Sequence, residues 1–296
     1  MKLSQRLAEP SILVAPGAYD AFTARLIETS EFEAVYFSGA GLSYTSLASP
    51  DLGLLTQAEM VDRVRSIANV IDVPLIADGD TGYGNATNVR RTVQLYEQAG
   101  ASAIQLEDQQ FPKRCGHFAG KELIPADEMA GKIRAAVSAR ESSEFLIIAR
   151  TDAASVAGIE PAIERSQMYA EAGADVLFVE SPQSEGELQN VAQALPNYPL
   201  MANMVEGGRT PLIQAETLEQ LGYSLVIYPN SLTRRFAQAG LELLEELHRS
   251  GTTKSMNRQM MSLGELNELL DLDAFRSFED EYLPKPNTSL EGGEPS

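Results

Sequence analysis

The chain is poor in cysteine, histidine and positive charge, and each shortage excludes a class of protein. Its 296 residues include one cysteine, two histidines, and 23 lysines and arginines against 42 aspartates and glutamates. A single cysteine excludes an intrachain disulfide, so a reducing compartment, the cytoplasm, is the expected location. The net charge of −19 argues against nucleic-acid binding, which requires basic patches that neutralise phosphate.

Long apolar runs are also missing. No stretch is long enough to cross a membrane without charge, and Met1–Pro10 lacks the apolar core of a secretion signal. We therefore expect a soluble protein that does not bind membranes. The hydrophobic content of 44% is nevertheless sufficient for a sizeable core, and the length suits one large α/β unit.

Short apolar segments recur along the chain, and helical patterns separate them. The segments predicted as strands are Ile12–Gly17, Ala34–Gly39, Pro74–Asp80, Ala103–Gln109, Phe145–Asp152, Val176–Ser181, Pro199–Glu206 and Ser224–Pro229. They lack strict alternation, as expected for parallel strands that are covered on both faces. Eight strand–helix repeats in about 230 residues are the period of a (β/α)₈ TIM-type barrel. An open, doubly wound sheet is the alternative, but the chain has no glycine-rich dinucleotide loop.

The helices follow the same pattern and continue beyond the eighth strand. Those predicted within the barrel include Ala86–Ala99, Ala126–Ala139, Ile159–Ala172 and Pro211–Leu221, several closed by a glycine. Leu232–His248 and Met261–Leu270 are surplus to a barrel, so we expect these C-terminal helices to pack against a neighbouring subunit. We predict one domain over residues 1–283 and a disordered tail over 284–296, which is rich in Pro, Gly and Glu.

Polar side chains gather at the carboxyl ends of the predicted strands, where barrel enzymes place their active sites. They are Ser38, Asp78, Asp80, Glu107, Arg150, Asp152, Glu180, Asn203 and Glu206. Packing alone does not explain this concentration at one pole of the barrel. We therefore predict an enzyme with its active site at that pole.

Asp78 and Asp80 favour a metal site. Two carboxylates at i and i+2 on a strand point to the same side, and oxygen-only ligands suit Mg²⁺ or Mn²⁺. Taken alone, an Asp/Gly-rich strand end is more often an ordinary turn. Glu107 and Asp108, which end the next predicted strand, shift the balance towards a metal.

Other polar residues suggest ligands for an anionic substrate. A buried Arg150 can clamp a carboxylate bidentately or form an internal salt bridge with Glu180 or Asp152, and both alternatives stay open. The small residues from Ser38 to Ala40 can offer backbone N–H groups to a carboxylate. Asn203 reads as a polar ligand on a loop that ends in glycines.

The lone cysteine has a polar context. Lys113, Arg114, Cys115, Gly116 and His117 are consecutive, and two cations and an imidazole favour the thiolate over the thiol. A lone cysteine is most often a structural thiol. This segment is too polar for a core position, however, and it follows a predicted strand, where function concentrates.

Together these motifs resemble the isocitrate lyase/phosphoenolpyruvate mutase superfamily, from about Leu3 to Leu283. The matching segments are Ser38–Gly39, Pro50–Gly53, Asp78–Gly84, Glu107–Gln109, Lys113–His117, Ala149–Asp152 and Asn203–Gly208. The Lys113–His117 segment resembles the carbon–carbon lyase branch, since mutases that act on C–P bonds carry a different loop. The resemblance implies a barrel whose last helix is exchanged between subunits, usually within a homotetramer.

The resemblance also implies a cofactor, a reaction and residue roles. Mg²⁺ is expected on Asp78, with Asp51, Asp80 and Glu107 acting directly or through water. A 2-hydroxy di- or tricarboxylic acid is split into a 2-oxo acid such as pyruvate and a second acid such as succinate. The expected catalytic residues are Cys115 as the acid, Tyr36 or a carboxylate as the base, and Lys113, Arg114, His117 and Arg150. The expected substrate ligands are Ser38, Gly39, Ala40, Gly116, His117, Arg150, Glu180, Asn203, Pro229 and Arg234.

The substrate stays open between two types. Arg234 resembles an arginine of 2-methylisocitrate lyases, whereas Val205 and its neighbours resemble the 2-alkylmalate and 2,3-dimethylmalate lyases. Pro229 resembles the lyases, since oxaloacetate hydrolases of this superfamily tend to have serine there. Oxaloacetate hydrolysis or decarboxylation and phosphonomutase chemistry are the catalytic alternatives, and a carboxylate-binding barrel without chemistry is the non-catalytic one.

Overall fold

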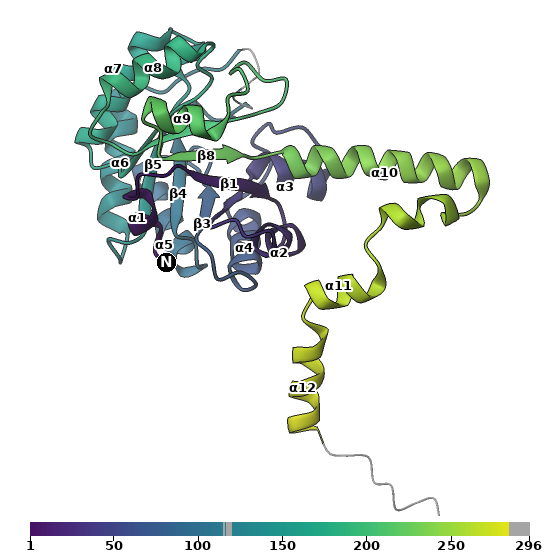
Figure 1. Cartoon of the computed structure of the whole chain (residues 1–296). Helices are drawn as coiled ribbons and strands as arrows, with labels where there is room; N and C mark the ends of the chain where they lie inside the picture. Colours follow the sequence, from purple (N-terminus) through teal and green to yellow (C-terminus); the bar gives the residue numbers. More distant parts are fainter. Residues whose placement is uncertain (115, 117–119, 284–296) are drawn as a thin grey trace, which may run out of the picture. The chain divides into compact units, whose positions relative to one another are not determined.

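The structure is a computed structural model, and it describes residues 1–114, 116 and 120–283 (Figure 1). The chain divides into two compact units, Met1–Gln238 and Ala239–Ser296. The predicted disorder of residues 284–296 falls outside the described residues. Among the described residues, no helix is both long and apolar enough to span a membrane.

The first unit is a closed barrel of eight parallel strands in chain order. The strands are β1 (Leu13–Ala18), β2 (Val35–Phe37), β3 (Leu75–Asp78), β4 (Ala103–Glu107), β5 (Leu146–Thr151), β6 (Val176–Val179), β7 (Leu200–Asn203) and β8 (Leu225–Tyr228). The barrel closes where β8 pairs with β1, with Leu13 opposite Leu225 and Pro16 opposite Tyr228. This confirms the predicted TIM-type (β/α)₈ barrel and excludes the open sheet.

Helices alternate with the strands, and most cover the outside of the barrel, whereas Leu3 and Leu7 of the first helix belong to the core of the barrel interior. The helices are α1 (Leu3–Leu7), α2 (Ala21–Thr29), α3 (Gly39–Leu47), α4 (Gln57–Ala68), α5 (Ala86–Gln98), α6 (Ala126–Ala139), a 3₁₀ turn (Ala153–Ser155), α7 (Ile159–Glu171), α8 (Glu185–Ala194) and α9 (Ala215–Leu221). Side chains such as Asp20 and Thr56 cap helix N-termini by accepting backbone N–H groups. At the C-terminus of α9, Gly222 takes a left-handed conformation with φ of 103°, which favours glycine.

Two hydrophobic cores lie on the two sides of the sheet. One fills the barrel interior and includes Ile76, Ile148 and Met201, and the other lies between the sheet and the helices and includes Ala77 and Ala149. Successive residues of a strand point to opposite faces. The residue that follows each outward-facing position therefore points inward, and this alternation brings the polar ends of β3, β4, β5 and β7 together inside one end of the barrel.

The helices after β8 are α10 (Ser231–Ser250), a 3₁₀ helix (Lys254–Gln259), α11 (Leu263–Leu269) and α12 (Leu272–Tyr282). α10 and α11 confirm the two predicted C-terminal helices, and α12 was not predicted. In the second unit, α12 leaves Phe275 and Phe278 exposed by 68% and 65%. These rings lie three residues apart on one helix face, so α12 presents an apolar stripe.

Candidate active site

A cavity lies among the inward-facing side chains at the carboxyl end of the barrel, where the sequence predicts the active site. The predicted site residues that line it are Tyr36, Ser38, Ala40, Asp51, Asp78, Glu107, Lys113, Arg114, Gly116, Arg150, Glu180, Asn203 and Pro229. Val205, Ile227 and Asn230 complete its wall. Cys115 and His117 fall outside the described residues, so their predicted roles as acid and substrate ligand stay predictions.

Arg150, near the end of β5, lies close to three carboxylates at the cavity. Its Nε lies 2.9 Å from Asp152 Oδ2 and 3.4 Å from Glu107 Oε2, and its Nη1 lies 3.3 Å from Glu180 Oε2. Burial alone would lower the pKa of the guanidinium, but Asp152, Glu107 and Glu180 hold it well above its ordinary value. The internal salt bridges with Asp152 and Glu180 are thus confirmed. The side chain still lines the cavity, so a substrate carboxylate can contact the same guanidinium.

Lys113 lies among carboxylates of the same region. Its Nζ is 2.6 Å from Asp51 Oδ1 and 2.8 Å from Asp80 Oδ1, and the side chain is buried. Burial alone would lower the pKa of the ammonium, but Asp80 and Asp51 raise it well above its ordinary value. Burial raises the pKa of Asp80 to about 6, against the opposing effect of Lys113. Asp80 is not part of the cavity wall, so any contact with a cation in the cavity would pass through water.

Asp78 and Glu107 offer oxygen atoms to a cation. Asp78 Oδ1 accepts the Asp80 N–H at 3.0 Å, and Oδ2 accepts the Gly39 N–H at 3.3 Å. Glu107 Oε1 is buried with no hydrogen-bond partner, and burial raises the pKa of this carboxyl well above its ordinary value. A buried oxygen without a partner is costly unless it meets a ligand or an ion.

The donor set fits Mg²⁺, which prefers oxygen and is held through one or two carboxylates while it keeps several waters. Within the described ranges, no three acidic, histidine or cysteine side chains are grouped closely enough to hold a metal alone. The orphaned Glu107 oxygen is the feature of this chain that favours such an ion.

Tyr36 is a hydrogen-bond donor in this structure. Its hydroxyl donates to Gln105 Oε1 at 3.1 Å, and the side chain is buried. Burial, followed by the charge of Asp78, raises the pKa of the phenol well above its ordinary value. Because the hydroxyl acts as a donor here, its contact gives no support to Tyr36 as the base, and the carboxylates stay candidates for that role. Gln105, which our sequence reasoning missed, lies two residues before Glu107 and so shares its face of β4.

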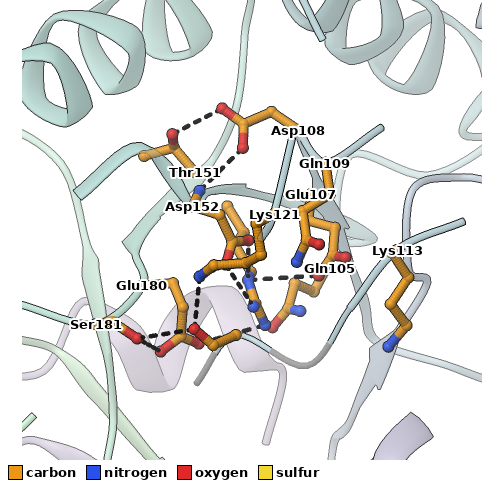
Figure 2. A network of polar contacts seen from close by, with 12 residues as sticks. Gln105, Glu107, Asp108, Gln109, Lys113, Lys121, Thr151, Asp152, Glu180 and Ser181 are labelled. Atoms are coloured by element: carbon orange, nitrogen blue, oxygen red, sulfur yellow. Dashed lines mark hydrogen bonds and ion pairs between the residues drawn. The ribbon is translucent and has the colours of Figure 1, made fainter. Parts of the chain in front are cut away.

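Asp108 follows Glu107 directly but points to the other side of the strand end. It accepts hydrogen bonds from Thr151 Oγ1 at 2.7 Å and from the Asp152 N–H at 2.9 Å (Figure 2). Arg165 Nη1 at 3.0 Å and the Tyr169 hydroxyl at 2.8 Å complete its contacts. Asp108 therefore supports the end of β5 from outside the cavity and does not join Glu107 in a metal site.

The stretch from Ser38 to Ala40 begins a helix. Ser38 is the N-cap of α3, and its Oγ accepts the Gly41 N–H at 3.1 Å. The Gly39 N–H is used by Asp78, and a Cβ at Gly39 would lie 2.9 Å from Asp78 Oδ2. Gly39 thus positions Asp78, while Ser38 and Ala40 face the cavity.

Of two further predicted substrate ligands, Asn203 lines the cavity and Arg234 does not. Asn203 Nδ2 donates to Glu180 Oε2 at 3.0 Å, and its Oδ1 is buried without a partner, so it is available to a substrate hydroxyl. Arg234 pairs with Glu206, with Nη1 3.3 Å from Oε2, and its side chain is 53% exposed. Arg234 is not part of the cavity wall, so its predicted contact with substrate has no support from its placement.

The chain is similar to several known proteins over most of its length. Residues 3–248 match the family described as phosphoenolpyruvate phosphomutase. The 2,3-dimethylmalate lyase of Eubacterium barkeri is 47% identical over 95% of this chain and 97% of its own length. A probable 2-methylisocitrate lyase of Corynebacterium glutamicum is 44% identical over 92% of this chain and 89% of its own.

Solved structures of similar sequence share the fold of this chain. Oxaloacetate acetylhydrolase in complex with the inhibitor 3,3-difluorooxalacetate superposes with a TM-score of 0.92 at 35% identity, covering 96% of this chain and 97% of that one. Phosphonopyruvate hydrolase in complex with oxalate and Mg²⁺ superposes with a TM-score of 0.87 at 34% identity, covering 95% and 98%.

Proposed function

Because the chain belongs to the phosphoenolpyruvate phosphomutase family, we propose that it is a Mg²⁺-dependent carbon–carbon lyase that acts on a 2-hydroxy dicarboxylate. The observation that carries this proposal is the composition of the cavity. The Arg150 guanidinium, which can bind a carboxylate, faces the oxygen cluster of Asp78 and Glu107. An anionic substrate and a hard cation can therefore share the cavity. A cytoplasmic enzyme agrees with the single cysteine of the chain.

The groups that line the cavity suit the following reaction. Asp78 would hold Mg²⁺, with Asp51, Asp80 and Glu107 acting directly or through water, and the bound ion would supply Lewis acidity that lowers the pKa of the substrate hydroxyl. A carboxylate of the cluster takes the hydroxyl proton. The oxygen electrons form the carbonyl of the 2-oxo acid as the adjacent carbon–carbon bond breaks.

The electrons of the broken bond pass to the departing acid, which leaves as an enediolate. Arg150 contacts the growing negative charge, and the neutral Tyr36 hydroxyl and Asn203 are further polar groups at the cavity. A proton added to the enediolate carbon completes the second acid. Cys115, the donor that the sequence predicts for this proton, is outside the described residues.

The wall formed by β7 and β8 favours a 2-alkylmalate over 2-methylisocitrate. Val205, Ile227 and Pro229 give that side of the cavity an apolar surface, which suits a methyl substituent. A tricarboxylate needs a partner for its third carboxylate, and the predicted partner, Arg234, pairs with Glu206 away from the cavity. We therefore propose 2,3-dimethylmalate, cleaved to pyruvate and propionate, as the better substrate.

The test is an assay of 2-oxo acid release from 2,3-dimethylmalate and 2-methylisocitrate with Mg²⁺, together with the loss of oxaloacetate. We expect kcat/KM for dimethylmalate to exceed that for methylisocitrate at least about tenfold, since the apolar wall of Val205, Ile227 and Pro229 suits a methyl group better than a carboxylate. A chelator should abolish turnover, and added Mg²⁺ should restore it. Consumption of oxaloacetate alone would identify a hydrolase or decarboxylase and refute the lyase proposal.

We also propose that the enzyme is a homotetramer in which C-terminal helices are exchanged between copies. In the first unit, an apolar groove of about 690 Å³ is lined by residues that include Val14, Leu26 and Tyr228. In the second unit, the apolar stripe of α12 carries Phe275 and Phe278. The groove and the stripe are both apolar, so each is suited to contact with an apolar surface of a second copy of this chain.

Light scattering tests this assembly. We expect a mass about four times that of the 32.1 kDa chain for the wild type, and dissociation when Phe275 and Phe278 are both changed to glutamate, because charge is costly in an apolar interface. A monomeric wild-type protein would contradict the proposal.

A further inference from the structure

Lys121 is a buried cation at the active-site end of the barrel that the proposed chemistry does not use. Its side chain is 2% exposed, and its Nζ lies 2.7 Å from Asp152 Oδ1 and 2.5 Å from the carbonyl oxygen of Gly116 (Figure 2). Lys121 is not part of the cavity wall. Any influence on the reaction must therefore pass through these two partners.

The first partner, Gly116, lies close to Arg150 and Glu180. A Cβ at this position would lie 2.5 Å from Arg150 Nη2 and 2.8 Å from Glu180 Cγ. The peptide therefore passes against both side chains and lines the cavity. Its carbonyl oxygen also lies 3.3 Å from the Ser181 hydroxyl, which in turn lies 3.0 Å from Glu180 Oε1.

The second partner, Asp152, is shared between Lys121 and Arg150. Arg150 Nε and Nη2 lie 2.9 and 3.1 Å from the two Asp152 oxygens, so the arginine binds this carboxylate bidentately. The Asp152 backbone is itself held by Asp108, which accepts its N–H. One carboxylate, anchored on the end of β5, thus fixes both the guanidinium and the lysine that holds the Gly116 peptide.

We infer that Lys121 is a positioning residue. It links the Gly116 carbonyl to Asp152, and so it fixes the position of the Gly116 peptide relative to Arg150, which binds the same carboxylate. An ammonium that donates to a carboxylate and a carbonyl at once makes charge-assisted hydrogen bonds to both. A neutral side chain of similar length would fill the space without either bond. The inference rests on the proposed lyase function for its kinetic consequences, but its structural claim stands on the contacts alone.

The test compares Lys121→Met with the wild type by kinetics and by tryptic cleavage after Arg114. We expect kcat to fall at least about tenfold, because a shift of an ångström at a reacting group costs that much or more. KM should change less than about threefold, since Arg150 keeps its carboxylate partners. Cleavage after Arg114 should become at least about fivefold faster, because Gly116, close to the scissile bond, loses its hydrogen bond from Lys121.

Arg140→Met is the matched control. Arg140 also joins a carboxylate, Asp175, to a backbone carbonyl, that of Phe145, but near the amino ends of β5 and β6. We expect it to lower the unfolding temperature without changing kcat or cleavage after Arg114. Equal effects of the two variants on kcat and cleavage, or no effect of Lys121→Met, would overturn the inference. If the wild type turned over no substrate, the lyase proposal would fail, and the cleavage comparison would still decide the role of Lys121.

Discussion

Replacing Arg150 with lysine is expected to lower kcat/KM by about 100- to 1,000-fold while the barrel stays folded. Lysine keeps the positive charge but cannot bridge Asp152, Glu107 and Glu180 while it also faces a substrate carboxylate, because it lacks the planar array of donors. Steady-state kinetics with the preferred 2-hydroxy acid measures the loss, and thermal unfolding confirms that the variant is folded.

Arg140→Lys is the control for this exchange, since Arg140 forms its ion pair with Asp175 outside the active-site end. We expect its kcat/KM to stay within about threefold of the wild type, as for changes that touch no reacting group. A loss of less than tenfold in Arg150→Lys would mean that the bidentate contacts of Arg150 do not contribute to the transition state.

Replacing Gly116 with alanine should have an effect of similar size. The added Cβ would meet Arg150 Nη2 at 2.5 Å and Glu180 Cγ at 2.8 Å, which is closer than real Cβ contacts allow. Either the peptide or the two side chains must move, and a displacement of this kind costs about 100-fold in turnover. Measurement of kcat for the folded variant tests the expectation.

Gly131→Ala is the matched control, because the nearest atom to its added Cβ is Arg134 Nη2 at 3.7 Å, an ordinary contact. Gly131 lies within α6, where alanine favours the helix by about 0.5–1 kcal/mol. This variant should be as active as the wild type and slightly more stable. Full activity of Gly116→Ala would show that the close approach at Gly116 is not required.

The fold could be predicted from the sequence because the barrel repeats one simple unit. Eight apolar segments of similar length, separated by helical patterns, leave few ways to cover both faces of a parallel sheet. The ends of the elements were less certain. The predicted strand Pro199–Glu206 is β7 only over Leu200–Asn203, because the glycines that follow belong to a turn.

The site could be predicted in outline because side chains alternate along a strand. Tyr36, Asp78, Glu107 and Arg150 point into the same end of the barrel, since each lies in register with inward-facing apolar residues. The same alternation explains why Asp108 does not share the cavity with Glu107. Applying it to every position of β4 would also have found Gln105.

Contacts made by loops could not be predicted in this way. Lys121 and Asp152 are 31 residues apart, and no periodicity relates them, so only the folded loop brings the two charges together. Lys113 and Asp51 likewise belong to different connections of the barrel. Arg234 is the converse case, since the motif suggests a substrate ligand and the folded chain pairs it with Glu206.

The polar and apolar sides of the cavity have a consequence for how such an enzyme can diversify. The ionic groups belong to β3, β4, β5 and the connections that follow β2, β4 and β6, whereas Val205, Ile227 and Pro229 belong to β8 and the residues after β7 and β8. Each strand of a barrel carries its own loop, so one sector can change while another is retained. Exchanges at these three apolar positions therefore offer a route to new substituents on the substrate that leaves the bond-breaking apparatus intact, both in natural divergence and in redesign.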